Sequence, residues 1–252
     1  MKGMRRHPLT LALAALGWAG FIVVSAWTAL FLADVVVSRT VDGPRRVPAL
    51  LAILIDLALL LLFAGQHSVM ARQPVKSWLR RRLPQRLERT GYVLATDVCL
   101  ALLLVWWQPW GGEIWRLTGV AAIVVWVLYA AGWLLAIGST FAVDHLELTG
   151  LRQAGWAAPR QAEPAGLTTG GLYAVVRHPL LSGLLIVFWA TPRMSAGHLL
   201  LAAAVTGYVL VGIRFEERDL RCTFGSAYDE YAARVPALLP RWRATSPAAP
   251  RE

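Results

Sequence analysis

Residues 172–183 read LYAVVRHPLLSG, and the chain continues through residues 184–189 as LLIVFW. A segment with basic, aromatic and imidazole side chains therefore runs directly into a wholly apolar one. In a membrane protein, such a change of polarity marks the boundary between water and lipid. At this boundary a membrane enzyme can bring polar groups to a substrate that is dissolved in lipid.

The polarity changes in the opposite order further along the chain, where residues 208–219 read YVLVGIRFEERD. The apolar parts of the two segments are expected to pair as the arms of a helical hairpin. Both charged parts then lie at the open end of that hairpin. The sequence therefore predicts that Arg177 and His178 lie close to Glu216 and Glu217.

The composition indicates an integral membrane protein. Hydrophobic residues make up 57% of the 252 residues, twelve are Trp, and the formal net charge is +10. The basic residues fall in short loops between long apolar runs, which is typical of membrane orientation and not of nucleic-acid binding, so we expect no nucleic-acid partner. The two cysteines, Cys99 and Cys222, offer no disulfide framework.

We predict an all-α integral membrane protein with about five to six transmembrane helices, including the C-terminal helical hairpin. A span needs roughly 20 apolar residues at 1.5 Å each. The expected helices cover residues at about 9–33, 47–70, 91–107, 117–141, 180–191 and 196–213. We expect a single domain over residues 1–240, followed by a disordered tail over residues 241–252.

The orientation follows from the basic loops. The loop from Arg72 to Arg89 carries seven basic residues against Glu88 alone, and Lys2, Arg5 and Arg6 precede the first span. By the positive-inside rule these segments are cytoplasmic. We therefore expect both termini and the Arg177 segment on the cytoplasmic side of a bacterial-type inner membrane.

Local signals define the C-terminal helices. Ser195 can cap the returning arm of the hairpin, and Gly225 is typical of a helix stop. Ser226 has the spacing of a capping box and predicts a further short helix. Tyr228 and Tyr231 are spaced to share one apolar face of it.

The charged residues of the hairpin have two readings. Arg177 offers a planar fork of donors for a carboxylate or phosphate, and His178 offers a proton that can be exchanged near neutral pH. Alternatively, both only anchor the interface. Glu216 and Glu217 point about 100° apart on a helix, so at most one faces inward, where it could pair with Arg177 or accept hydrogen bonds. Alternatively, they form a solvated face.

Other titratable residues lie in or near the predicted spans. His67 ends the second span and His145 begins the long polar segment 142–171, which is either functional or flexible. Both histidines are candidates for a proton acceptor, whereas their spacing does not favour a metal site, and we expect none. Asp56 and Asp97 lie within apolar runs, where hydrogen bonding between helices is the favoured role.

The motifs resemble a known family of membrane methyltransferases. The segments Arg177-His178-Pro179 with Gly183 and Glu216-Glu217 with Phe224-Gly225 are similar to the C-terminal half of the isoprenylcysteine carboxyl and phospholipid methyltransferases. A closer resemblance, to the methanethiol S-methyltransferase and NnrU-related family, covers nearly the whole chain. It rests on His67–Arg72, Gly150–Gln153, Phe188–Pro192, Gly197–Leu200 and Glu216–Leu220.

The resemblance implies S-adenosylmethionine as the methyl donor. Its pocket would be built by Arg177, His178, Pro179 and Gly183 together with the turn at Glu216 and Glu217. Arg177 would bind the carboxylate of the donor, and one of the two glutamates would bind its ribose.

The implied reaction converts a small thiol, methanethiol, into dimethyl sulfide. Its nucleophile is the thiolate, so a nearby base or positive potential is needed. His67, His145 and Tyr173 are the candidates for that role. The alternatives are an enzyme that methylates the carboxylate of a prenylated cysteine and a non-enzymatic membrane protein of the NnrU kind.

Overall fold

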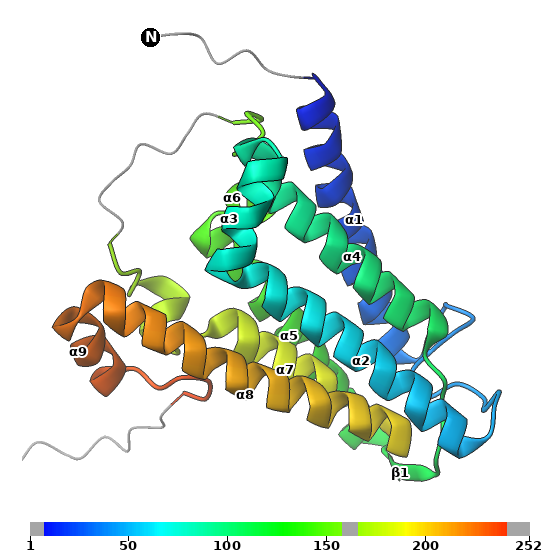
Figure 1. The fold of residues 1–252 in the computed structure, drawn as a ribbon. Coiled ribbons are helices and arrows are strands. Elements are labelled where there is room, and N and C mark those ends of the chain that lie inside the picture. The colour runs from blue at the N-terminus through cyan, green and yellow to red at the C-terminus, as the bar shows by residue number, and fades with distance from the viewer. Residues whose placement is uncertain (1–7, 158–165, 241–252) are drawn as a thin grey trace, which may run out of the picture.

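The computed structural model describes residues 8–157 and 166–240, and helices dominate them (Figure 1). Five helices within this part of the chain are long and apolar enough to cross a membrane. They are α1 (Pro8–Ala33), α2 (Ala49–Ala71), α4 (Glu88–Trp106), α5 (Gly119–Val143) and α8 (Ala196–Phe224). The chain is therefore an all-α integral membrane protein, as predicted. The predicted tail at 241–252 and the basic residues Lys2, Arg5 and Arg6 lie outside the described residues.

Shorter elements lie at the two ends of the helix bundle (Figure 1). We call one end the basic end; it carries α3 (Gln73–Arg82), η1 (Gln85–Leu87), α6 (His145–Leu148), η2 (Gly171–Ala174) and α9 (Ser226–Arg234). The opposite end is called the strand end, because the antiparallel strands β1 (Glu113–Arg116) and β2 (Arg193–Ser195) pair there. The helix α7 (Pro179–Trp189) runs from the basic end toward the strand end.

The predicted hairpin is present as α7 and α8, but the closest neighbour of α7 is α5. Gly183 of α7 faces Gly132 and Ala136 of α5. A Cβ atom on Gly183 would lie 2.6 Å from both the Gly132 carbonyl oxygen and the Ala136 nitrogen. Such a backbone approach is possible only for glycine, and small residues promote it between membrane helices.

The helix α8 extends further than the predicted arm at 196–213. The apolar run defines only the part of the helix that contacts lipid, whereas the helix itself continues until a residue ends it. Gly225, with φ of 56°, is that residue, as predicted. At the other end, the Ser195 side chain accepts a hydrogen bond from the His198 backbone N–H, which confirms the predicted cap.

Three local predictions were wrong or incomplete. The segment after the second span was expected as a loop, but residues 73–82 form α3, whose first turn contains Pro74. The two-stranded sheet was not predicted, because strands of four and three residues are too short to show a periodic pattern. Ser226 does not cap α9; Gly225 already occupies the boundary position, so Ser226 is the first helical residue.

The largest buried apolar cluster lies in the half of the bundle toward the strand end. Its bulkiest members are Phe31, Leu104 and Trp107, which come from α1, from α4 and from the residue that follows α4. Val187 of α7 joins the same cluster. This packing fixes α7 at the strand end and leaves its first turn to meet α8 and α9 at the basic end.

Candidate functional site

Arg177 and Glu217 form a buried ion pair at the basic end. The guanidinium Nε and Nη2 atoms donate to Glu217 Oε1 at 2.9 and 2.5 Å, and Nη1 donates to the carbonyl oxygens of Ala232 and Val235 at 3.0 and 2.5 Å. Both side chains are only 11% exposed. The predicted proximity is confirmed, but four of the five N–H groups of the fork already bind protein acceptors.

His178 connects the two glutamates. Its Nε2 atom lies 3.3 Å from Glu217 Oε1, and its Nδ1 atom lies 3.4 Å from Glu216 Oε2. The His178 side chain is 5% exposed, whereas the Glu216 side chain is 55% exposed. As predicted, only one of the two glutamates faces inward, because both lie on the helix α8 and not on a turn.

The C-terminal segment 231–238 fastens this cluster, a contact that the sequence did not reveal. Two of its carbonyl oxygens accept backbone N–H groups of the Arg177 segment, a third accepts a serine hydroxyl, and a tyrosine hydroxyl donates back. These pairs are Arg177 N to Pro236 O, His178 N to Ala237 O, Ser182 Oγ to Leu238 O and Tyr231 Oη to Tyr173 O. The first turn of α7 is thereby held from two sides.

Three further predicted site residues have positions that the fold explains. Pro179 occupies the start of α7, where a backbone N–H would have no partner within the helix, so its absence in proline breaks no helical hydrogen bond. Gly183 makes the close contact with α5 described above. Burial and the nearby Glu216 carboxylate both raise the pKa of the Tyr173 hydroxyl, so this group stays protonated at neutral pH.

One face of α8 presents an open strip between Tyr208 and Glu216. Tyr208, Gly212 and Glu216 are spaced four residues apart and so share one side of the helix. A Cβ atom on Gly212 would meet nothing within 4 Å, and both Gly212 and Glu216 are exposed. The helix surface at Gly212, between the charged cluster and Tyr208, is therefore not covered by another part of the described chain.

His67 lies among aromatic rings near the inner end of the strip. Phe63 stacks on its imidazole with centroids 5.4 Å apart, and the rings of Tyr92 and Tyr208 lie 5.0 and 6.2 Å from it. The Tyr92 hydroxyl is 2.7 Å from Nε2 and 3.0 Å from Nδ1. Tyr208 and Ser68 share a hydrogen bond of 3.1 Å. Sequence analysis identified His67 but neither tyrosine.

His145 is held away from this cluster by its own partners. Its Nε2 atom accepts the indole N–H of Trp18 at 2.9 Å, and Nδ1 lies 3.0 Å from the Thr140 hydroxyl. Phe141 stacks on the ring. Burial lowers the pKa of His145, although the Asp144 carboxylate opposes that effect. Both nitrogens have hydrogen-bond partners, so His145 joins α1 to α5.

The two aspartates in the spans behave differently. Asp56 is fully buried, and its Oδ1 atom accepts the Gln108 backbone N–H at 2.9 Å, which ties α2 to the segment after α4. Asp97 of α4 packs against Gly20 of α1. A Cβ atom on Gly20 would lie only 2.7 Å from Asp97 Oδ2. Asp97 Oδ2 has no hydrogen-bond partner within the described residues. Hydrogen bonding is therefore present at Asp56, whereas Asp97 makes a tight packing contact.

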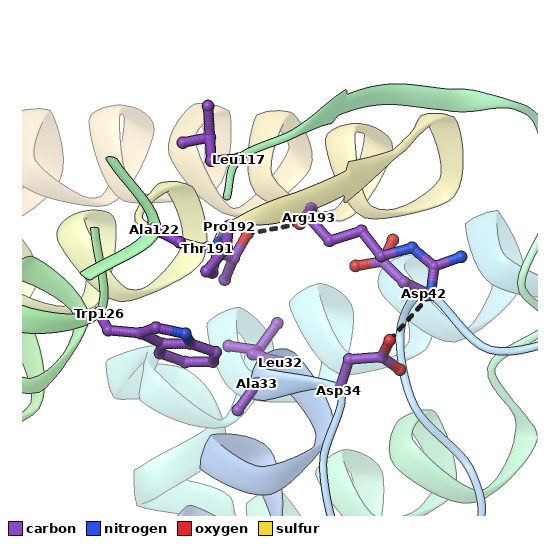
Figure 2. Close-up of a pocket in the computed structure, with 10 residues that line it drawn as sticks. All are labelled: Leu32, Ala33, Asp34, Asp42, Leu117, Ala122, Trp126, Thr191, Pro192 and Arg193. Carbon is purple, nitrogen blue, oxygen red and sulfur yellow. Dashed lines mark hydrogen bonds and ion pairs between the residues drawn. The ribbon is translucent and has the colours of Figure 1, made fainter. Parts of the chain in front are cut away.

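A cavity of about 230 Å³ opens at the strand end (Figure 2). Trp126 and the aliphatic residues form one wall, while Asp34, Asp42 and Arg193 form the other (Figure 2). Arg193 pairs with Asp34 at 3.0 Å. This cavity lies beside the N-terminus of α8, roughly 30 Å along that helix from Glu217, so the two sites are separate.

The charged wall of the cavity is joined to a buried histidine. Asp42 accepts the Ser195 backbone N–H at 2.9 Å and lies 2.9 Å from Nδ1 of the fully buried His198. Sequence analysis gave no role to Asp42 or His198. A histidine inside an apolar run was the signal that could have identified them. Among residues 8–157 and 166–240, no cluster of histidine, cysteine or carboxylate side chains has the form of a metal site.

Comparisons with known proteins agree over most of the chain. The family model described as NnrU protein matches residues 55–237. Methanethiol S-methyltransferase 2 of Bradyrhizobium diazoefficiens is 44% identical over 92% of this chain and 90% of its own length. Methanethiol S-methyltransferase of Mycobacterium tuberculosis is 42% identical over 94% of this chain and 98% of its own.

A more distant similarity reaches animal proteins. Nurim of Sus scrofa is 34% identical over 66% of this chain and 67% of its own length. No solved structure matches the chain.

Proposed function

Because the chain belongs to the NnrU protein family, we propose that it is a membrane methyltransferase that transfers a methyl group from S-adenosylmethionine to methanethiol or a similarly small thiol. The relatives named methanethiol S-methyltransferase support this substrate. The family match over residues 55–237 covers both the charged cluster at the basic end and the spans beside it.

The observation that carries the proposal is the open strip on α8. It begins at the exposed Glu216, passes Gly212, where space is free, and ends at the aromatic rings around Tyr208. The strip thus joins a polar, water-facing group to an apolar region inside the membrane span. A donor with a polar nucleoside and amino-acid part and a reactive methyl group needs both environments.

The residues at the charged end fit such a donor. The Glu216 carboxylate is accessible and can accept hydrogen bonds from ribose hydroxyls or pair with an ammonium group. His178 and Tyr173 lie beside it. The guanidinium of Arg177 is occupied by Glu217 and two carbonyl groups, so its role is to hold the charged cluster together. The donor is then bound by Glu216 and its neighbours.

S-adenosylmethionine supplies an electrophilic methyl group on a positively charged sulfur. Attack by a thiolate cancels both charges, so a site of low dielectric constant favours the reaction. The lipid-facing spans around Tyr208 provide that environment. A small apolar thiol also dissolves in lipid and can approach the strip from the side of the membrane.

The same proposal includes the location of the protein. We place it in a bacterial-type inner membrane with the basic end in the cytoplasm, because the seven basic residues from Arg72 to Arg89 lie at that end. The donor, which is made and kept in the cytoplasm, then reaches Glu216 directly from water.

The test combines an activity assay with a binding assay. Purified protein incubated with S-adenosylmethionine and methanethiol is expected to release dimethyl sulfide into the headspace. Gly212→Leu fills the strip and is expected to abolish binding of S-adenosylhomocysteine in calorimetry. Gly207→Leu is the matched control, because Gly207 lies on the same helix, faces open space and is turned about 100° away from Tyr208.

Other outcomes would favour the alternatives. Methylation of a farnesylated cysteine on its carboxylate, with small thiols ignored, would replace the thiol assignment. If neither substrate is methylated and S-adenosylhomocysteine does not bind, the protein is not a methyltransferase.

A further inference from the structure

We propose that the aromatic cluster of Phe63, His67, Tyr92 and Tyr208 is the thiol-binding site, with His67 as the base that accepts the thiol proton. The inference rests on the proposed methyltransferase function and adds the residues that bind and activate the acceptor substrate.

The cluster is assembled from three spans. Phe63 and His67 come from α2, Tyr92 from α4 and Tyr208 from α8. All four side chains are partly exposed, so the rings are not sealed inside the bundle. An apolar thiol dissolved in the surrounding lipid can therefore contact them without a deep cavity.

The cluster lies where the reactive end of the donor is expected. Tyr208 and Glu216 are about 12 Å apart along α8, at 1.5 Å per residue. Gly212 lies halfway between them and leaves the strip open. A donor bound through its polar part at Glu216 thus extends toward the aromatic rings, and aromatic faces attract a positively charged sulfonium.

The electrostatics of the cluster suit a thiolate. The guanidinium carbon of Arg89 lies 5.4 Å from the centroid of the Tyr92 ring, so positive charge stands close to His67 and Tyr92. Positive potential stabilises the anionic form of a thiol. The neighbouring aromatic rings lower the local dielectric constant, which strengthens this effect.

The step can be written with all atoms accounted for. The S–H bond of the thiol breaks, and its proton passes to an imidazole nitrogen of His67. The thiolate sulfur attacks the methyl carbon, and the bond between that carbon and the donor sulfur breaks with its electron pair remaining on the donor. Two neutral thioethers result, and the imidazolium then returns its proton to water.

Tyr92 is a positioning residue in this arrangement. Its hydroxyl is the nearest hydrogen-bonding group to the His67 ring nitrogens, at 2.7 and 3.0 Å, and Phe63 restrains the other side of the ring by stacking. The other candidate bases are less suited. The two nitrogens of His145 are bound by two different groups, whereas the single Tyr92 hydroxyl can occupy only one nitrogen of His67 at a time. Tyr173 lies at the charged end of the strip beside Glu216.

The first experiment measures the pH dependence of two variants. His67→Gln is expected to lower kcat/KM for methanethiol by about 100-fold at neutral pH, the usual contribution of a general base. Because the thiolate then forms only in solution, the remaining rate should rise about tenfold per pH unit below the thiol pKa. Tyr92→Phe is expected to lower the rate about tenfold through loss of one hydrogen bond.

Two controls separate this result from misfolding and from loss of the donor site. Tyr129→Phe removes a tyrosine hydroxyl from another span, where it donates to the Ala29 carbonyl oxygen, and should leave the thiol kinetics unchanged. S-adenosylhomocysteine should bind all three variants with wild-type affinity. If His67→Gln does not fold, Tyr92→Phe still tests the site.

A second readout does not use activity. Diethyl pyrocarbonate modifies accessible neutral imidazoles, and dimethyl sulfide serves as an unreactive probe of the thiol site. Modification of His67, followed by mass spectrometry, should slow about tenfold at high occupancy of the probe. The buried His198 should remain unmodified in either case.

The outcomes distinguish the two proposals. Wild-type kinetics in both His67→Gln and Tyr92→Phe, or no protection of His67 by dimethyl sulfide, would overturn the thiol site while leaving the methyltransferase function intact. A loss that is equal at every pH would show that His67 is not the base. Wild-type protein that neither binds S-adenosylhomocysteine nor makes dimethyl sulfide would overturn the function itself.

Discussion

At the scale of single residues, Arg177 was predicted either to bind the carboxylate of the donor or to pair with one of the two glutamates of the hairpin, and the structure shows the pair with Glu217. The sequence marked it as a charged group at the membrane boundary, and it does lie in the candidate site. Its guanidinium, however, compensates the buried Glu217 carboxylate and binds two carbonyl groups of the C-terminal segment. A buried carboxylate needs such a partner, because an isolated charge is poorly solvated there.

This role predicts a difference between two arginines that touch the same carboxylate. Arg177→Ala leaves Glu217 buried without its main partner and is expected to destabilise the protein by about 3 kcal/mol. Arg221 lies 3.4 Å from Glu217 and is 47% exposed, so Arg221→Ala should cost under about 1 kcal/mol. Thermal unfolding in detergent micelles measures both. Equal midpoints for the two variants would contradict the assigned role of Arg177.

At the scale of elements, α7 owes its position to α5 more than to its hairpin partner. Its eleven residues extend about 16 Å, roughly half of a hydrocarbon core of about 30 Å. A helix this short cannot span the membrane alone, so it has to be buried against neighbours. The contact of Gly183 with the backbone of α5 holds it there and sets the height at which Arg177 and His178 meet α8.

A glycine pair tests this explanation. In Gly183→Ala, the new methyl group would lie 2.6 Å from α5 backbone atoms, so the two helices must separate, at a cost of about 1 to 3 kcal/mol. Gly138→Ala on α5 adds the same methyl group where nothing lies within 4 Å and should be nearly neutral. Thermal unfolding of the two variants measures this difference, and Gly183→Ala should have the lower midpoint. If Gly183→Ala left the thermal midpoint unchanged, the close contact with α5 would not explain why glycine occupies this position.

At the scale of the whole molecule, the two ends of the bundle contain different groups. The strand end holds the sheet, the Asp42–His198 pair and a cavity, whereas the basic end holds the charged cluster and, among residues 8–157 and 166–240, most of the exposed cations. The candidate methyl-transfer strip begins at the basic end and leads into the membrane span. This arrangement requires the basic end to face the compartment that contains the donor.

The two native cysteines provide a test of that orientation. Cys222 is exposed near the basic end of α8, whereas Cys99 is buried within α4. A maleimide that does not cross membranes should label Cys222 in inverted vesicles and not in intact cells with a permeabilised outer membrane. Cys222→Ser removes the signal and serves as the control. Labelling in intact cells would place the basic end outside the cytoplasm.

The sequence by itself determined the class of the protein and the approximate spans. Apolar runs of about 20 residues have one favourable environment, the lipid core, and a helix satisfies their backbone groups there. The stop at Gly225, the cap at Ser195 and the proximity of Arg177 to the two adjacent glutamates also followed from local chemistry and from the expected hairpin.

Only the tertiary structure decided which side chains gather around the candidate site. Tyr92 and Tyr208 come from spans far apart in sequence, and the closure of the Arg177 segment by residues 231–238 depends on how α9 folds back. Hydropathy is shared by all faces of a lipid-embedded helix, so it does not reveal which face meets which neighbour. That choice depends on steric fit, such as the glycine contact of α7 with α5, and becomes visible only when the helices are packed.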